Sequence, residues 1–190
     1  MIQKTIFLRS LQVIAFSSAV IFSAVSANAQ TIADENQVEI ALSDKLDGVT
    51  NHYCIDIAGG NKNIDITKGL QVHTCYSYQG SLGSDQVFDK SEFDNNKLYM
   101  PNYDVCATAS ALTAGSSIGL ASCEDGNELQ TISFENGKFS PVAAPNMCVT
   151  AAQDTRFGRS DKHQIKKLSL EMCSDDLAPY QTWRGRTEQD

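Results

Sequence analysis

The chain has 190 residues, a formal net charge of −8 and 42% hydrophobic residues, the composition of an ordinary globular protein with enough apolar side chains for a core. The acidic balance excludes nucleic acid as a partner, because phosphate binding needs a basic face, and it gives no attraction to an anionic bilayer. The length suits one domain and hardly two.

The first 29 residues have the pattern of a secretory signal peptide. Lys4 and Arg9 precede a mostly apolar stretch over residues 11–25, and Ala27 and Ala29 supply the small-x-small pattern that a signal peptidase accepts. The stretch is shorter than the ~20 residues of a membrane span, so a retained anchor is the weaker interpretation. We expect cleavage after Ala29, an N-terminal extension over residues 30–37, and a soluble exported protein, secreted or periplasmic, without membrane insertion.

The cysteines are even in number and all follow this leader, which favours disulfides formed in an oxidising compartment. No C-x-x-C is present, although zinc and redox centres prefer that close spacing. Metal ligation and free buried thiols remain the alternatives. The six residues are Cys54, Cys75, Cys106, Cys123, Cys148 and Cys173.

The expected strands fall into three blocks with the same internal order. In each block a cysteine opens an alternating apolar and polar stretch, and a second cysteine closes another. Beyond the second cysteine a glutamine is followed two places later by a large apolar residue. The glutamines are 44 and then 51 residues apart, which indicates an internal triplication. The pairs are Gln86 with Phe88, Gln130 with Ile132 and Gln181 with Trp183.

Turn signals separate about twelve short strands, the first at residues 40–42. Asn95-Asn96 and Asn136-Gly137 each predict a hairpin, and Asp125-Gly126 predicts a loop turn. No segment after the leader has a sustained helical stripe. The last strand, near Trp183, is expected to pair with the first, and the simplest disulfide pattern keeps each bridge inside one block.

These motifs resemble the ricin B-type (R-type) lectin domain. The resemblance implies an all-β fold, a β-trefoil of three pseudo-repeats with one intra-repeat disulfide each. It covers residues 38–184 and leaves 185–190 as a C-terminal tail. Phe88 and Ile132 depart from the tryptophan that the family prefers at these positions.

Strand alternation by itself predicts a polar site in the first repeat. If Ile55 and Ile57 point inward, Asp56 points outward, and Gln71 and His73 do the same on the neighbouring strand. These three side chains are therefore expected to converge on one surface patch. A carboxylate, an amide and an aromatic ring suit the hydroxyls and the C–H face of a sugar.

The family resemblance extends this site and restricts it to one repeat. It implies sugar contacts from Asp56, Gln71, His73, Asp85 and Gln86, and it implies a galactose-type sugar. The second repeat has lost every ligand group and the third has no carboxylate in place. The acid is replaced by Thr108 and by Thr150, and Glu171 stands where a ring is expected to stack.

Structural interpretations stand beside these roles. The three glutamines are expected to satisfy backbone groups where hairpins meet. Asp56 could instead form an ion pair with Lys62 or Lys68. His73 could be an exposed strand residue without a binding role. The ring that stacks on a sugar could then come from Tyr76 or Tyr78.

No enzyme, cofactor or metal site is indicated. Residues 115–119 match G-x-S-x-G, but no helix signal follows, so the serine elbow of a hydrolase is not expected. The basic run over residues 162–167 is interpreted as a solvated loop.

The leading hypothesis is an exported carbohydrate-binding protein whose partner is a glycan or glycoconjugate. The alternative is a β-trefoil protein-interaction module, similar to a toxin subunit or a protease inhibitor, with a protein partner and no sugar binding.

Overall fold

The computed structural model describes residues 35–59, 64–76 and 82–187, and the expected signal peptide lies outside these residues. The described fold is almost entirely β. Its helices are α1 (Ala178–Gln181) and the 3-10 helices η1 (Ile66–Lys68) and η3 (Lys90–Asn95). Its strands are β1 (Gln37–Leu42), β2 (Tyr53–Ile57), β3 (Leu70–Thr74), β4 (Val87–Asp89), β5 (Tyr99–Met100), β6 (Val105–Ala109), β7 (Ile118–Ala121), β8 (Ile132–Glu135), β9 (Lys138–Pro141), β10 (Met147–Ala151), β11 (Arg156–Phe157), β12 (Gln164–Met172) and β13 (Trp183–Arg186).

The triplication is confirmed by the strands next to the cysteines. β2 pairs with β3, β6 with β7, and β10 with β12, each time antiparallel. One disulfide closes each pair, so the expected pattern of bridges within repeats is confirmed. The bridges are Cys54–Cys75, Cys106–Cys123 and Cys148–Cys173, with Cα–Cα distances of 4.9, 5.0 and 5.0 Å.

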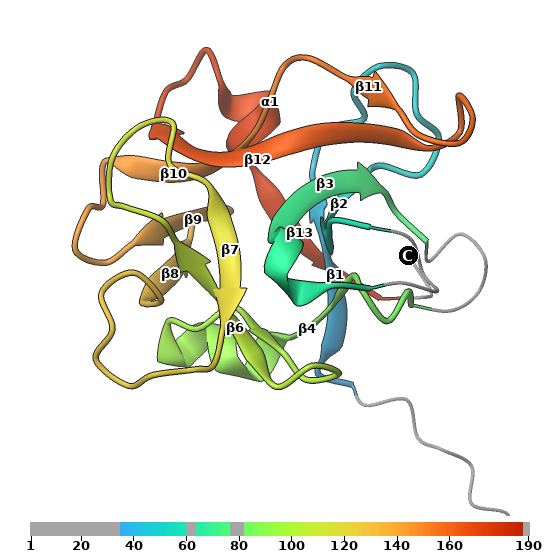
Figure 1. The fold of residues 1–190 in the computed structure, drawn as a ribbon. Coiled ribbons are helices and arrows are strands. Elements are labelled where there is room, and N and C mark those ends of the chain that lie inside the picture. Colours follow the sequence, from blue (N-terminus) through green and yellow to red (C-terminus); the bar gives the residue numbers. More distant parts are fainter. Residues whose placement is uncertain (1–34, 60–63, 77–81, 188–190) are drawn as a thin grey trace, which may run out of the picture. The chain divides into compact units, whose positions relative to one another are not determined.

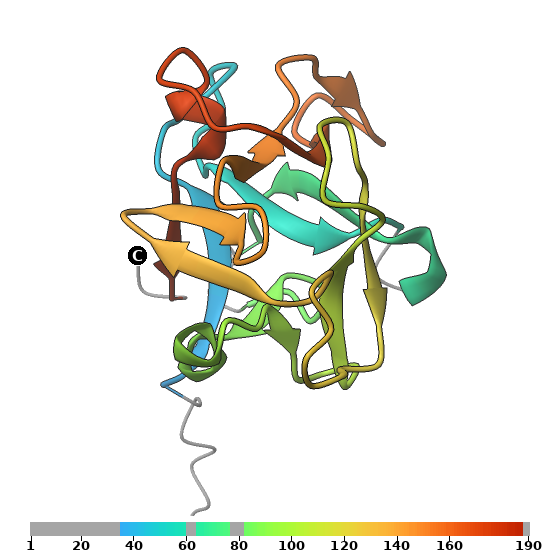
Figure 2. The same ribbon diagram turned by 90° about the vertical axis from the view of Figure 1, so that its left-hand side faces the viewer.

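The first and last strands pair, as a cyclic arrangement of repeats requires. β1 runs antiparallel to β13 with Leu42 opposite Trp183, and it also pairs with β2 and β4. Figure 1 labels these strands and Figure 2 shows them turned by 90°. The largest sheet has the order β10-β12-β3-β2-β1-β13, so strands of the first and third repeats share one sheet.

The core draws apolar side chains from all three repeats into one cluster. Phe88, Ile132 and Trp183 lie in it with at most 1% of their surface exposed. The Trp183 indole N–H also donates to the carbonyl of Val149 at 2.9 Å. Among the described residues no helix has the length and apolarity to cross a bilayer.

The three recurrent glutamines tie the same backbone groups in every repeat. In each repeat the glutamine side-chain oxygen accepts from the backbone N–H of the residue directly after the second cysteine. The glutamine side-chain nitrogen donates to the backbone carbonyl of the residue directly before the same cysteine. These distances run from 2.8 to 3.4 Å. The expected structural role is therefore confirmed. The contacts join Gln86 to Tyr76 and Thr74, Gln130 to Glu124 and Ser122, and Gln181 to Ser174 and Met172.

One of the two predicted hairpins forms and the other does not. Asn136 and Gly137, with φ of 51° and 78°, connect β8 to β9, as a two-residue turn requires. The prediction of a hairpin at Asn95-Asn96 is wrong, because residues 90–95 form the 3-10 helix η3. The Asp89 side chain caps this helix by accepting from the N–H of Ser91 at 2.9 Å, and Asn96 ends it in the left-handed region.

Two further sequence expectations meet different outcomes. Ser117 of the G-x-S-x-G match is followed by the strand β7 and not by a helix, as expected. The prediction of a solvated loop over residues 162–167 is wrong, because residues 164–167 are part of β12. The physical reason is Lys166, which is buried against Asp47 and so holds the strand to the body of the protein.

Candidate functional site

The first repeat places the predicted polar side chains on one face of β2 and β3. Asp56 lies directly opposite Gln71, and His73 is two residues further along β3. The alternating neighbours Ile55 and Val72 belong to the core, so the three polar residues share the other face. The chain therefore brings them together as the alternation predicted.

This face is buried, which differs from the expected surface patch. The polar side chains lie side by side with almost no exposed area. The exposed fractions are 0% for Asp56, 6% for Gln71, 5% for His73, 2% for Asp85 and 0% for Gln86.

The third repeat provides part of this cover. β12 pairs with β3 so that Ile165 lies opposite His73 and Lys167 opposite Gln71, and β11 places Arg156 opposite Ile165. Figure 1 shows β12 running along β3, with β11 beyond it. The Arg156 guanidinium donates from Nη2 to Gln71 Oε1 at 2.8 Å. A hairpin from the third repeat thus forms a wall of the first-repeat site.

Aromatic rings form a second side of the site. The His73 ring centroid lies 5.2 Å from that of Tyr76 and 5.4 Å from that of His163. Gly83 packs so closely here that a Cβ would lie 2.5 Å from the Tyr76 ring and 3.1 Å from Asp85 Oδ1. Tyr76, considered from sequence as an alternative ring, is therefore a neighbour of both His73 and Asp85.

The His73 ring is held in one orientation and kept neutral. Its Nδ1–H donates to the carbonyl of Thr74 at 2.8 Å, which leaves Nε2 as an acceptor. Burial lowers the pKa of His73 and outweighs the hydrogen bond to the Thr74 carbonyl, which raises it, while His163 and Arg156 add smaller lowering effects. A neutral ring suits stacking and hydrogen bonding to a hydroxyl.

The two acids are the most unusual groups of the site. Both oxygens of Asp56 and Oδ2 of Asp85 are buried without a hydrogen-bond partner among the described residues. Burial raises the pKa of Asp56 well above its ordinary value, and the charge of Asp85 adds to this, while the nearby Gln71 and Gln86 amides and Arg156 act in the opposite direction. Burial also raises the pKa of Asp85. Groups of this kind call for an explanation, because buried polar atoms are normally paired.

In the other two repeats a threonine stands at the position of Asp56. Thr108 accepts from Gln130 Nε2 at 3.0 Å, and Thr150 accepts from Gln181 Nε2 at 2.9 Å. These hydroxyls are therefore paired with the structural glutamine of their own repeat. At the equivalent position the Gln86 amide lies near Asp56, but neither Asp56 oxygen has a partner at hydrogen-bond geometry among the described residues.

A group of metal-ligand atom types lies behind the site. Atoms of Glu39, Cys54 and Cys75 lie within 4.8 Å of one another. The two sulfurs are bonded to each other, and a disulfide is not the thiolate that binds a metal ion. Glu39 instead accepts from the backbone N–H of Tyr76 at 3.2 Å.

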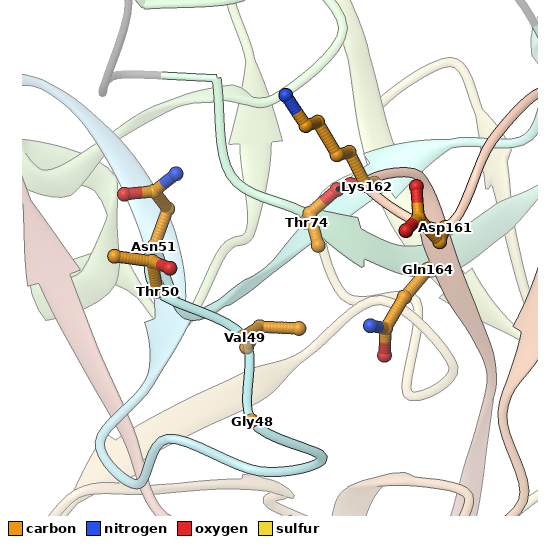
Figure 3. A pocket seen from close by; sticks show the side chains of 8 residues that line it. All are labelled: Gly48, Val49, Thr50, Asn51, Thr74, Asp161, Lys162 and Gln164. Atoms are coloured by element: carbon orange, nitrogen blue, oxygen red, sulfur yellow. Dashed lines mark hydrogen bonds between the residues drawn. The ribbon is translucent and has the colours of Figure 1, made fainter.

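A separate hollow of about 340 Å³ lies between the loop of residues 48–51 and the turn that precedes β12. Figure 3 shows Val49 on one side of it, Asp161 and Lys162 on the other, and Thr74 between them. Gln164 at its edge accepts from the Tyr53 hydroxyl at 2.6 Å. Within the described part of the chain, its lining holds none of the buried unpaired oxygens seen at Asp56.

Sequence reasoning missed the contribution of the third repeat. Arg156 and His163 lie beside Gln71 and His73 although they are far away along the chain. The available signal was the length of that repeat, 51 residues between glutamines against 44 before it, together with the basic residues in it.

Comparison with known proteins agrees with the fold. The family of ricin-type β-trefoil lectin domains matches residues 43–183, and the chain belongs to this family. A search of curated protein sequences gives no match. The family supports carbohydrate binding as the general function and gives no indication of an enzyme.

Solved structures share the architecture at low sequence identity, so they show the fold alone. The C-half of an earthworm R-type lectin in complex with GalNAc is 12% identical, with a TM-score of 0.56 over 80% of this chain and 98% of that one. A mutant of the earthworm lectin C-terminal domain in complex with 6'-sialyllactose is 14% identical, with a TM-score of 0.54 and the same coverage. The agglutinin of Abrus precatorius is 16% identical, with a TM-score of 0.50 over 79% of this chain and 46% of that one.

Proposed function

We propose that this protein is an exported lectin with one working site, in the first repeat, for a galactose-type sugar. The observation that carries the proposal is the Asp56 carboxyl, which is fully buried and has no partner for either oxygen among the described residues. Because Asp56 is 0% exposed, the proposal requires the side chains that cover this face to move when a sugar binds. Two adjacent hydroxyls of a pyranose would then donate to these oxygens and so supply the missing hydrogen bonds.

The surrounding groups suit the remaining surface of such a sugar. His73, held by Thr74, presents a neutral ring to the C–H face, with the Tyr76 ring beside it. Gln71 and Asp85 add polar atoms beside Asp56 and His73. The Gln86 side chain accepts from the backbone N–H of Tyr76 and so supports the backbone next to the Tyr76 ring. Thr108 and Thr150, already paired in the other repeats, support a single site.

The test is calorimetric titration of the protein with galactose and N-acetylgalactosamine. Asp56→Asn keeps the shape of the side chain but replaces one acceptor with a donor, and it is expected to weaken binding by about 10–100-fold, the worth of one hydrogen bond to a charged group. Glu171→Gln, an acid-to-amide change in the third repeat at the position equivalent to His73, is expected to leave the affinity unchanged. Unchanged binding by Asp56→Asn would remove the assignment of the site, and capture of a protein partner without any sugar binding would favour the interaction module.

Export is the second part of the proposal. It is supported by the leader-like sequence over residues 1–29 and by three disulfides in the folded part. We expect the mature chain to begin at Gln30 and to keep residues 30–37, the domain at 38–184 and the C-terminal residues 185–190, of which Gly185 and Arg186 belong to β13. Mass measurement of the protein recovered from the cell envelope or medium tests this, and an intact Met1 terminus there would contradict it.

A further inference from the structure

A hollow of about 430 Å³ adjoins the candidate sugar site on the side of the third repeat. Gln71 lines both, and beyond it the hollow is bounded by β11, β12 and the segment between β10 and β11. The register places Lys167 beside Gln71 on the same face as Asp56. A ligand in the sugar site therefore has open space next to it in one direction.

This hollow is basic in an acidic protein. Arg156 and Lys167 are exposed at its rim, and Asp154 is the acid in its lining. In the described residues the ion pairs are Lys97 with Asp125 and Lys166 with Asp47, so neither Arg156 nor Lys167 is neutralised by a salt bridge. Two cations that form no salt bridge with a described residue are thus gathered beside the site, while the chain carries a net charge of −8.

Arg156 is aimed at the site by its own hydrogen bond. Arg156 Nη2 donates to Gln71 Oε1 at 2.8 Å, and this bond orients the guanidinium plane. The other N–H groups of the guanidinium are then available to a ligand. The positive charge of Arg156 acts on both Asp56 and His73, since it contributes to the pKa shifts of both side chains. Two adjacent N–H groups of a planar guanidinium fit the two oxygens of a carboxylate or a sulfate.

Building on the proposed function, we propose that the preferred ligand is an acidic saccharide: a galactose-type unit in the first-repeat site, with a neighbouring carboxylate or sulfate held by Arg156 and Lys167. Two cations are too few to hold a polyanion such as nucleic acid on a protein of this charge. They are enough to select a singly charged substituent whose position is fixed by the sugar beside it.

The test compares neutral and acidic versions of one disaccharide on the full mature protein. Lactose, 3'-sialyllactose, 6'-sialyllactose and 3'-sulfated lactose are titrated calorimetrically at low and at high salt. We expect at least one acidic sugar to bind about tenfold more tightly than lactose at low salt, with the advantage reduced at high salt. The sialylated and sulfated arms distinguish a carboxylate ligand from a sulfate ligand.

Charge-removing variants locate the effect. Arg156→Met with Lys167→Met is expected to abolish the advantage of the acidic sugar over lactose, measured as the ratio of the two affinities in the same variant, because loss of the Arg156 hydrogen bond to Gln71 weakens lactose binding as well. Lys167→Met alone is expected to reduce this ratio while lactose affinity changes by less than about threefold. Arg159→Met, an exposed cation of the same hairpin outside the hollow, controls for net charge and is expected to keep the advantage.

The outcomes separate the two proposals. Lactose binding with no advantage for any acidic sugar, or an advantage that survives the double substitution, overturns the inference and leaves the lectin site standing. Absence of binding by every sugar overturns the proposed function and the inference together.

Discussion

Asp56→Thr is expected to raise the free energy of unfolding by about 1–3 kcal/mol and to abolish sugar binding, with a loss of about 100-fold or more. The second and third repeats already hold threonine at this position, where its hydroxyl accepts from the glutamine amide at 3.0 and 2.9 Å. The same change in the first repeat replaces two unpaired buried oxygens with one hydroxyl that Gln86 is able to satisfy. Urea unfolding and sugar titration of the same preparation measure both effects.

The gain in stability is expected to depend on pH. Burial, with the charge of Asp85, raises the pKa of Asp56, so the folded protein holds a proton that the unfolded chain releases above about pH 4. Stability of the wild type therefore falls as the pH rises from that value through the folded pKa. The advantage of Asp56→Thr is smaller at pH 4 than at pH 7. An equal advantage at both values, or a loss of stability at pH 7, would show that Asp56 is not the strained group inferred from its surroundings.

Asp47→Asn is expected to destabilise the protein by about 3 kcal/mol, because it leaves the charge of Lys166 buried without a counter-ion. The Lys166 side chain is 0% exposed, and its Nζ lies 2.7 Å from Asp47 Oδ2. The same ammonium donates to the carbonyl of Gln153 at 2.8 Å and to the Thr155 hydroxyl at 2.7 Å, and it lies 5.1 Å from the Tyr53 ring centroid. Asparagine keeps the shape and tolerates the positive φ of 52° at this position, so the change isolates the charge.

A double substitution separates the ion pair from packing. Asp47→Asn with Lys166→Met is expected to recover most of the loss, because methionine fills the same apolar space without a charge. Asp125→Asn, which breaks the exposed pair with Lys97, is the control and is expected to have no measurable effect on urea unfolding. A double variant as unstable as Asp47→Asn would assign the effect to the Asp47 loop and not to the charge.

Acid is expected to remove the difference between Asp47→Asn and the wild type. Burial raises the pKa of Asp47, but hydrogen bonds from Lys166, Thr155 and Tyr53 outweigh it and hold the pKa below its ordinary value. The ion pair therefore stabilises the fold above about pH 4 and is lost as the pH falls through the lowered pKa.

The architecture could be predicted because its signals are local and repeated. Each cysteine, each alternating stretch and each glutamine occurs three times in the same order, so an error at one position is corrected by the other two. The closing pair of Leu42 and Trp183 follows from that symmetry. The Asn95-Asn96 hairpin failed because its evidence was a single dipeptide, and the capping of η3 by Asp89 decided the local structure.

The site could be predicted only within its own repeat. Asp56 and Gln71 are matched by strand alternation, which depends on neighbouring residues alone. The pairing of Lys167 with Gln71 joins two repeats and has no local signature, so neither the burial of the site nor the position of Arg156 followed from the sequence. The sequence predicts a loop for the basic run that contains Lys166 for the same reason, since its partner Asp47 lies in another repeat.

The strand β12 serves two repeats at once: one half completes the third hairpin and the other borders the first-repeat site. The third repeat, which has no acid at the position of Asp56, thereby shapes the surroundings of the candidate site in the first repeat. Insertions or deletions between residues 152 and 163 would alter ligand choice without touching Asp56 or Gln71.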